Sequence, residues 1–193
     1  MKLIVVPHGA KVTGVTQYPP ELGADPPMTM EGKWKMLNLV PALRALGPYD
    51  GVYCSLMDRA CGTMCTIVKQ LGIRRVVCIY ELGQMGNLEP DGKVIMYPGH
   101  EQDNVVIWQT EGLFSVGRII WEDYTQLSAS QPSVHRNLKV LVFSHRPILA
   151  GLVANAKGIT NREGIQKILD DPDLTKNGFV VFNYDGNFLT LVE

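Results

Sequence analysis

Three stretches of the chain decide the fold, because each joins a run of apolar residues to a short polar segment. They are LIVVPHG at residues 3–9, GVYCSLMDRA at residues 51–60 and KVLVFSHR at residues 139–146. Each apolar run is short and rich in β-branched or aromatic residues, which predicts a buried strand. In an open α/β sheet the carboxyl ends of the parallel strands meet at one edge, where ligands bind. We therefore expect the polar residues that follow these strands to lie together.

Strand and helix signals alternate along nearly the whole chain, with glycine and proline at the boundaries. The predicted strands cover residues 2–6, 51–54, 75–80 and 139–143, the predicted helices cover residues 29–46 (bent or divided at Pro41), 58–71, 104–126 and 147–158, and residues 178–192 form a hairpin that turns at Asp185-Gly186. Residues 81–97 lose this periodicity and are predicted to form a loop layer over the ligand-binding edge. The pattern predicts a single domain, residues 1–193, with an α/β fold: a three-layer αβα sandwich with a mostly parallel sheet and an antiparallel edge strand.

Composition excludes several classes of function. The net charge is −1, so the chain lacks the basic field that sequence-independent binding of nucleic acids requires. No apolar run approaches the roughly 20 residues that span a bilayer, so we expect no membrane partner. The run at residues 3–6 is too short for a signal peptide, which predicts a cytoplasmic protein. The four cysteines form no CxxC pair, so we expect reduced thiols and no metal site.

Five segments, in order, resemble motifs of the histidine phosphatase superfamily, also called phosphoglycerate-mutase-like. The family's Arg-His-Gly corresponds to residues 7–9, its Asp-x-Pro-Leu-Thr-x-x-Gly to residues 25–32, its Ser-Ser-Pro-x-x-Arg-Ala-x-x-Thr to residues 54–63, its spaced Glu, Phe-Gly and Glu to Glu81, Met85-Gly86 and Glu89, and its Ser-His-Gly-Gly to residues 144–147. One such motif is weak evidence, but five in sequence span nearly the whole chain and indicate the phosphoglycerate-mutase-like fold.

The resemblance implies a role for each matching residue in a phosphomonoester hydrolase. His8 is the nucleophile that forms a phosphohistidine, and an imidazole with a pKa of about 6.5 is largely unprotonated at neutral pH. Arg59 binds the non-bridging oxygens and His145 donates to them from the other side. Glu81 protonates the leaving oxygen, with Glu89 as the alternative acid. The substrate is a small phosphorylated molecule, and neither a metal nor an organic cofactor is implied.

The chain departs from the family pattern at the phosphate. Pro7 stands where the family has an arginine that grips phosphate, and proline supplies neither charge nor an N–H donor. Arg146 stands where the family has glycine, so Arg146 is a candidate phosphate ligand that compensates for Pro7, with Lys11 as the alternative.

Two hypotheses about function stay open. The first is a phosphatase with altered phosphate recognition, favoured over a mutase because 193 residues leave little room for inserted segments. The second is a catalytically impaired relative that binds a phosphorylated ligand or a protein partner. The apolar edge of the tail hairpin also favours a homodimer.

Overall fold

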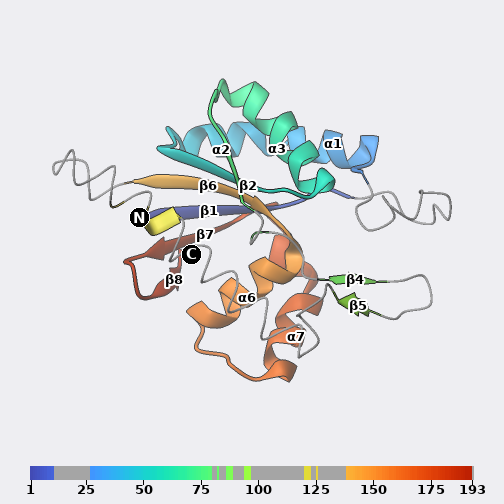
Figure 1. The fold of residues 1–193 in the computed structure, drawn as a ribbon, viewed down its shortest axis with the longest axis vertical. Helices are drawn as coiled ribbons and strands as arrows, with labels where there is room; N and C mark the ends of the chain where they lie inside the picture. Colours follow the sequence, from blue (N-terminus) through green and yellow to red (C-terminus); the bar gives the residue numbers. More distant parts are fainter. Residues whose placement is uncertain are drawn as a thin grey trace.

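The chain forms a six-stranded sheet with helices on both faces, and a second, two-stranded sheet beside it (Figure 1). The computed structural model describes residues 1–10, 27–79, 82, 86–88, 94–96, 120–122, 125 and 138–192. The strands are β1 (Lys2–Pro7), β2 (Gly51–Ser55), β3 (Val77–Ile79), β4 (Gly86–Leu88), β5 (Val94–Met96), β6 (Lys139–Ser144), β7 (Val180–Tyr184) and β8 (Leu189–Leu191). The helices are α1 (Met30–Leu37), α2 (Val40–Leu46), α3 (Asp58–Leu71), α6 (Arg146–Ala156) and α7 (Arg162–Asp170), with a 3-10 helix, η4 (Pro172–Thr175).

The strand order of the large sheet is β3-β2-β6-β1-β7-β8. The pairs β2–β3, β2–β6 and β1–β6 are parallel, whereas β1–β7 and β7–β8 are antiparallel. The hairpin predicted at the tail supplies the antiparallel edge, and Gly186 in its turn has a φ of 104°, a value that favours glycine. The predicted fold class is therefore confirmed.

Alternate side chains of β1 supply two hydrophobic cores, one on each face of the sheet. Leu3 and Val5 pack into the core beneath α6 and α7, and Ile4 and Val6 pack into the core beneath α2 and α3. Figure 1 shows these helices on opposite sides of the sheet. Full burial of one such side chain stabilises the fold by roughly 1.5–3 kcal/mol. A run that is apolar on both faces is what a central strand covered by helices requires.

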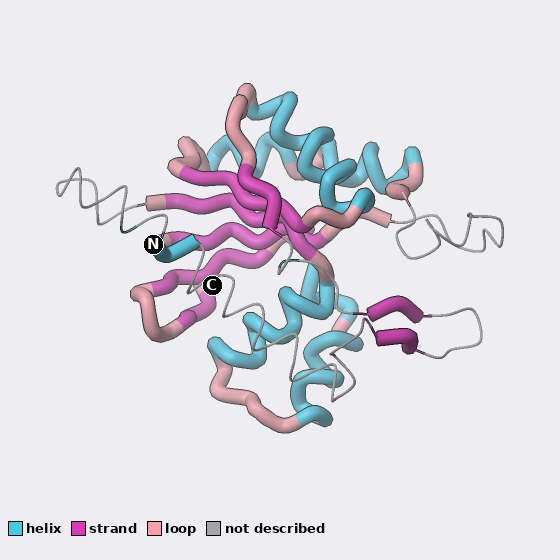
Figure 2. The backbone as a smooth tube through the Cα atoms, in the orientation of Figure 1, coloured by secondary structure: helices cyan, strands magenta, loops and turns pink. Residues whose placement is uncertain are grey.

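Most predicted boundaries agree with the structure. Pro41 lies in the first turn of α2 and divides the predicted first helix, and α3 ends at Gly72, whose φ is 72°. The prediction that residues 81–97 are only loop is wrong, because β4 and β5 form a short antiparallel pair there (Figure 2). The sequence patterns also miss α7, which is short and mostly polar. Most of the predicted helix at residues 104–126 lies outside the described residues.

Pro7 ends β1 without costing the sheet a hydrogen bond. The N–H of Lys2 donates to the carbonyl of Leu138, just before β6, and the N–H of His8 donates to the carbonyl of Ser144 in β6. The backbone N–H groups of even-numbered residues in β1 therefore point toward β6. The nitrogen of Pro7 faces the other neighbour, β7, whose pairing with β1 stops at Val5. A proline is tolerated where no partner strand needs its missing donor.

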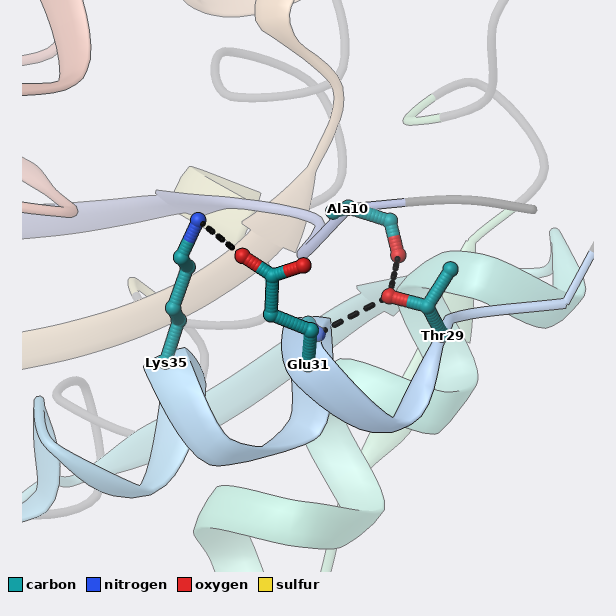
Figure 3. Close-up of polar contacts among 5 residues, drawn as sticks. Ala10, Thr29, Glu31 and Lys35 are labelled. Atoms are coloured by element: carbon teal, nitrogen blue, oxygen red, sulfur yellow. Dashed lines mark hydrogen bonds and ion pairs between the residues drawn. The ribbon is translucent and has the colours of Figure 1, made fainter. Parts of the chain in front are cut away.

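The segment that follows β1 is tied to the start of α1, and Figure 3 shows these contacts. The N–H and the hydroxyl of Thr29 both donate to the carbonyl of Ala10, at 2.8 and 3.2 Å. The same hydroxyl oxygen accepts from Gly32 N–H at 2.9 Å, which confirms Thr29 as the predicted N-cap. Within α1, Glu31 and Lys35 form an exposed ion pair at 2.8 Å. The two hydrogen bonds to Ala10 fix the chain just after His8.

Candidate functional site

The strand order brings three motifs to one edge of the sheet. β2, β6 and β1 are adjacent and parallel, so their carboxyl ends lie side by side. His8 follows β1, His145 follows β6, and Arg59 lies in the first turn of α3, which follows β2. The rings of His8 and His145 lie edge to face, with centroids 5.1 Å apart. Residues 137 positions apart in the sequence thus meet where ligands bind in α/β sheets.

His8 is held in one tautomer by its own backbone. Its Nδ1 lies 2.7 Å from the carbonyl oxygen of Gly9. A carbonyl oxygen only accepts hydrogen bonds, so Nδ1 carries the proton and Nε2 of the neutral ring has the lone pair. Gly9 is fixed in turn, because its N–H donates to the hydroxyl of Thr63 at 3.0 Å. An imidazole with its lone pair on Nε2 is a nucleophile or a base.

Little space separates Gly9 and Ala10 from the start of α1, where Gly32 lies. A Cβ on Gly9 would lie 2.5 Å from Sδ of Met28, and a Cβ on Gly32 would lie 2.6 Å from the carbonyl oxygen of Ala10. The start of α1 therefore packs directly against the backbone that follows His8. The backbone contact at Gly32 is the structural reason for glycine there, whereas a Cβ on Gly9 would first meet a flexible methionine side chain.

His145 is fully buried and links two strands of the site. Its Nε2 lies 2.9 Å from the hydroxyl oxygen of Ser55 at the end of β2. Its backbone is extended, with φ −121° and ψ 154°, and it is the N-cap of α6. Sequence reasoning does not single out Ser55, although Ser55 lies within a quoted motif. Ser55 ends β2 and meets His145 only because β2 and β6 are neighbours in the sheet, so no sequence signal identifies it.

Arg59 is a cation buried at the start of a helix. Only 1% of its surface is exposed, and one terminal nitrogen donates to Sδ of Met57 at 3.5 Å. Cations are disfavoured in the first turn of a helix, where the positive end of the macrodipole lies. Burial of a guanidinium is also costly unless an anion compensates its charge. Both costs fall if an anion binds at this edge.

The two helix starts at this edge lack a side-chain cap, as does the start of α2 at Leu39. α3 and α6 begin at Met57 and His145 as N-caps, and neither has a side-chain cap hydrogen bond. By contrast, Thr29 caps α1 and Asn161 caps α7 through side-chain oxygens. The first N–H groups of a helix and its macrodipole together attract anions. Two helix starts of this kind add positive potential beside Arg59.

Arg146 does not direct its guanidinium to His8 or His145 in this structure. Its Nε donates to the carbonyl of Leu169 at 2.9 Å, and a terminal nitrogen donates to the carbonyl of Asp171. These carbonyls lie at the carboxyl end of α7, where a cation is favourable. Phosphate binding by Arg146 stays a prediction, and it requires these two hydrogen bonds to break. Pro7 is buried and uncharged at the end of β1.

Several predicted residues lie outside the described part of the chain. They are Lys11, Glu81 and Glu89. The next residue after Glu81 is described, however: Leu82 is buried, and its carbonyl accepts a hydrogen bond from the hydroxyl of Ser144 at 2.8 Å. Ser144 directly precedes His145. The chain immediately after Glu81 is therefore anchored beside the site.

The described residues show neither a metal-binding cluster nor a membrane-spanning helix. Among the described residues, no group of three or more His, Cys, Asp or Glu side chains is arranged to hold a metal ion. Within the same ranges, no helix has the length and apolar character needed to cross a bilayer. The four cysteines are free thiols. Burial raises the pKa of the Cys54 thiol, which keeps it protonated.

Comparison with known proteins gives a match in structure but not in sequence. No protein-family model matches the chain, and no curated protein matches it. YhfR from Bacillus stearothermophilus superposes with a TM-score of 0.65 at 16% identity, covering 99% of this chain and 95% of YhfR. Mycobacterial glucosyl-3-phosphoglycerate phosphatase Rv2419c gives 0.61 at 15% identity, covering 99% and 95% of the two chains. The protein histidine phosphatase SixA, solved with tungstate, gives 0.57 at 18% identity, covering 100% and 95%. The chain therefore has the fold of histidine phosphatases.

Proposed function

We propose that the protein is a phosphomonoester hydrolase that acts through a phosphohistidine on His8. The observation that carries the proposal is the 2.7 Å hydrogen bond from Nδ1 of His8 to the carbonyl of Gly9. That bond keeps the lone pair on Nε2, the atom that must attack phosphorus. The proposal is supported by the shared fold and by the meeting of His8, Arg59 and His145 at one edge.

The reaction has two displacements at phosphorus. In the first, Nε2 of His8 bonds to phosphorus while the bond from phosphorus to the ester oxygen breaks, and the leaving oxygen takes a proton. In the second, water loses a proton, bonds to phosphorus and breaks the phosphorus–nitrogen bond, which restores His8. Arg59, His145, the first N–H groups of α3 and the N–H of Arg146 at the start of α6 stabilise the non-bridging oxygens, where negative charge concentrates.

Glu81 is our proposed acid in the first step and base in the second. The hydrogen bond from Ser144 to the carbonyl of Leu82, at 2.8 Å, supports this choice because it anchors the residue next to Glu81. A Glu81→Gln variant is expected to lose roughly a hundredfold or more in kcat, as removal of a general acid does. Glu89→Gln is the matched control, since Glu89 is the competing carboxylate. The reverse order of effects would assign the role to Glu89.

The test of the proposed function is hydrolysis of p-nitrophenyl phosphate without added metal. Wild-type protein is expected to turn over, and His8→Ala is expected to abolish turnover. His100→Ala is a matched control, because His100 belongs to none of the five motifs. Because phosphohistidine is hydrolysed in acid, the reaction is stopped with alkali before the phosphorylated protein is measured. Equal rates in wild type and His8→Ala would refute the proposal.

A second candidate function is binding of a phosphorylated ligand without turnover. The observation that favours it is the direction of the Arg146 guanidinium, which contacts α7 while Pro7 supplies no charge. A site with fewer cationic groups stabilises the transition state less. Calorimetric titration with tungstate, together with a panel of phosphate esters, separates the two candidate functions. Tungstate binding that depends on Arg59, with no hydrolysis of any ester, supports the binding protein.

A further inference from the structure

We propose that Ser55 is a positioning residue that holds His145 in the tautomer with its proton on Nδ1. The hydroxyl oxygen of Ser55 lies 2.9 Å from Nε2 of His145, and both residues are fully buried. The catalytic consequence rests on the proposed function, whereas the tautomer itself does not. Ser55 does not touch phosphorus in this scheme, because it acts through the ring of His145.

The direction of the hydrogen bond follows from the other partner of Ser55. The backbone N–H of Met57 donates to the Ser55 hydroxyl oxygen at 3.2 Å, and an N–H group only donates. The hydroxyl proton of Ser55 still needs an acceptor, since a buried donor is rarely left unsatisfied. Among the described residues, Nε2 of His145 is the acceptor that the Ser55 hydroxyl reaches. The hydroxyl therefore donates to Nε2, and the proton of the neutral ring is on Nδ1.

Ser55 is itself held in place by its carbonyl group. The thiols of Cys54 and Cys61 both donate to the carbonyl oxygen of Ser55, at 3.1 and 3.3 Å. Cys54 pairs with Phe143 in the β2–β6 ladder, two residues before His145. The position of the hydroxyl is thus set by the sheet and by α3 together. A hydroxyl fixed in this way orients a ring more firmly than a mobile surface serine would.

The tautomer decides which atom of His145 is available as a donor. With Nε2 occupied by Ser55, the N–H at Nδ1 is the group that donates to a phosphoryl oxygen. A donor set in advance toward developing charge stabilises a transition state without reorganisation. His8 has its proton on Nδ1 too, held by Gly9, so both rings have the same tautomer for different reasons.

The first measurement is the nitrogen-15 chemical shift pattern of the histidine rings in the wild-type protein at pH 8. Long-range proton–nitrogen correlation spectra distinguish the two neutral tautomers directly. We expect His145 to show a protonated Nδ1 and an unprotonated Nε2. A protonated Nε2 would overturn the proposal, whatever the activity of the protein.

The second measurement compares Ser55→Ala, Ser55→Thr and Thr66→Val. Thr66 is the matched control, since its hydroxyl donates to the carbonyl of Gly62 within α3 and contacts neither histidine. We expect Ser55→Ala to populate both tautomers of His145 and to lower kcat roughly tenfold to a hundredfold, the size of effect seen when the group that orients a metal-binding histidine is removed. Ser55→Thr keeps the hydroxyl and restores the wild-type tautomer.

The outcomes separate this proposal from the proposed function. If Ser55→Ala keeps the wild-type tautomer and kcat, the Ser55 proposal is overturned while the hydrolase survives. If the wild-type protein hydrolyses no phosphate ester, the proposed function fails, and the ring tautomers of wild type and Ser55→Ala alone decide the role of Ser55. A loss of kcat in Thr66→Val as large as in Ser55→Ala would show that any lost hydroxyl has this effect, which overturns the proposal.

Discussion

Replacing Pro7 by arginine tests whether the site lacks one cation. Pro7 is the last residue of β1, and it lies on the same face as Leu3 and Val5, directly before His8. An arginine here starts one residue from the proposed nucleophile. Because the nitrogen of residue 7 faces beyond the end of the β1–β7 pairing, the restored N–H neither gains nor breaks a ladder bond. The substitution therefore changes the site more than the sheet.

The size of the effect follows from the kind of hydrogen bond that is added. A hydrogen bond to a charged group contributes about 1.5–3 kcal/mol, against about 0.5–1.5 kcal/mol for a neutral bond. At about 1.4 kcal/mol for each factor of ten, Pro7→Arg is expected to raise kcat/KM roughly tenfold to a hundredfold over wild type. Pro7→Gln is the matched control, because it adds a polar side chain and an N–H without charge. Loss of the proline ring lowers stability by about 0.4–1 kcal/mol in both variants.

The assay is p-nitrophenyl phosphate hydrolysis under kcat/KM conditions, with tungstate affinity measured on the same preparations. Urea unfolding measures the stability of both variants, because a guanidinium at this buried position costs stability unless an anion compensates its charge. The reasoning is refuted if the two variants have the same kcat/KM and the same tungstate affinity while both are folded. In that case charge at position 7 does not limit the site.

Three further predictions concern stability. Arg146→Ala is expected to lower the free energy of unfolding by about 0.5–1.5 kcal/mol, because the partly exposed carbonyls of Leu169 and Asp171 at the end of α7 lose their donor. Unchanged tungstate affinity would confirm a structural role, whereas a loss would support Arg146 as a phosphate ligand. Gly32→Ala is expected to lower the free energy of unfolding by about 1–3 kcal/mol, because the new Cβ would lie 2.6 Å from the carbonyl oxygen of Ala10. Gly62→Ala in α3 is the control, since its Cβ would meet only Met28, at 3.8 Å. Urea unfolding should show this control to be more stable than wild type by about 0.5–1 kcal/mol. Burial raises the pKa of Tyr49 to about 12, so the folded protein binds the phenol proton more tightly than the unfolded protein does. The contribution of Tyr49 to the free energy of unfolding is therefore complete below about pH 10 and is lost as the pH rises toward 12. A Tyr49→Phe variant whose stability falls equally over this pH range would contradict the assignment.

The large sheet was predictable because the apolar sequence of its central strands matches their burial in the structure. The apolar runs at β1, β2 and β6 are buried on both faces, so composition alone marks them as central strands. The hairpin β7–β8 carries its own turn signal at Asp185-Gly186. In contrast, β4 and β5 are three residues each, and β4 begins with glycine, so the period of two never becomes visible. Helix α7 is short, and Ile165 is its one buried residue.

The site was predictable only in part, for a different reason. His8 and His145 directly follow strands, and Arg59 lies in the first turn of the helix after β2; a sequence pattern locates these boundaries. The direction of a long side chain is decided by contacts that are far away in sequence. Arg146 lies next to His145, yet its guanidinium binds the end of α7, which the sequence patterns did not predict. The role of Ser55 likewise depends on the neighbour relation between β2 and β6, which follows from topology rather than from spacing.

The strand order also explains why His145 is the residue on which the site depends most. β6 lies between β2 and β1, so His145 is the group that contacts Ser55 on one side and His8 on the other. His8 and Ser55 are each fixed by backbone contacts of their own, at Gly9 and at Met57. A change at His145 therefore disturbs both neighbours, whereas a change at either neighbour leaves the other in place. It follows that Ser55→Ala and His8→Asn should be nearly additive in stability, while each should couple to His145→Gln in a double-mutant cycle.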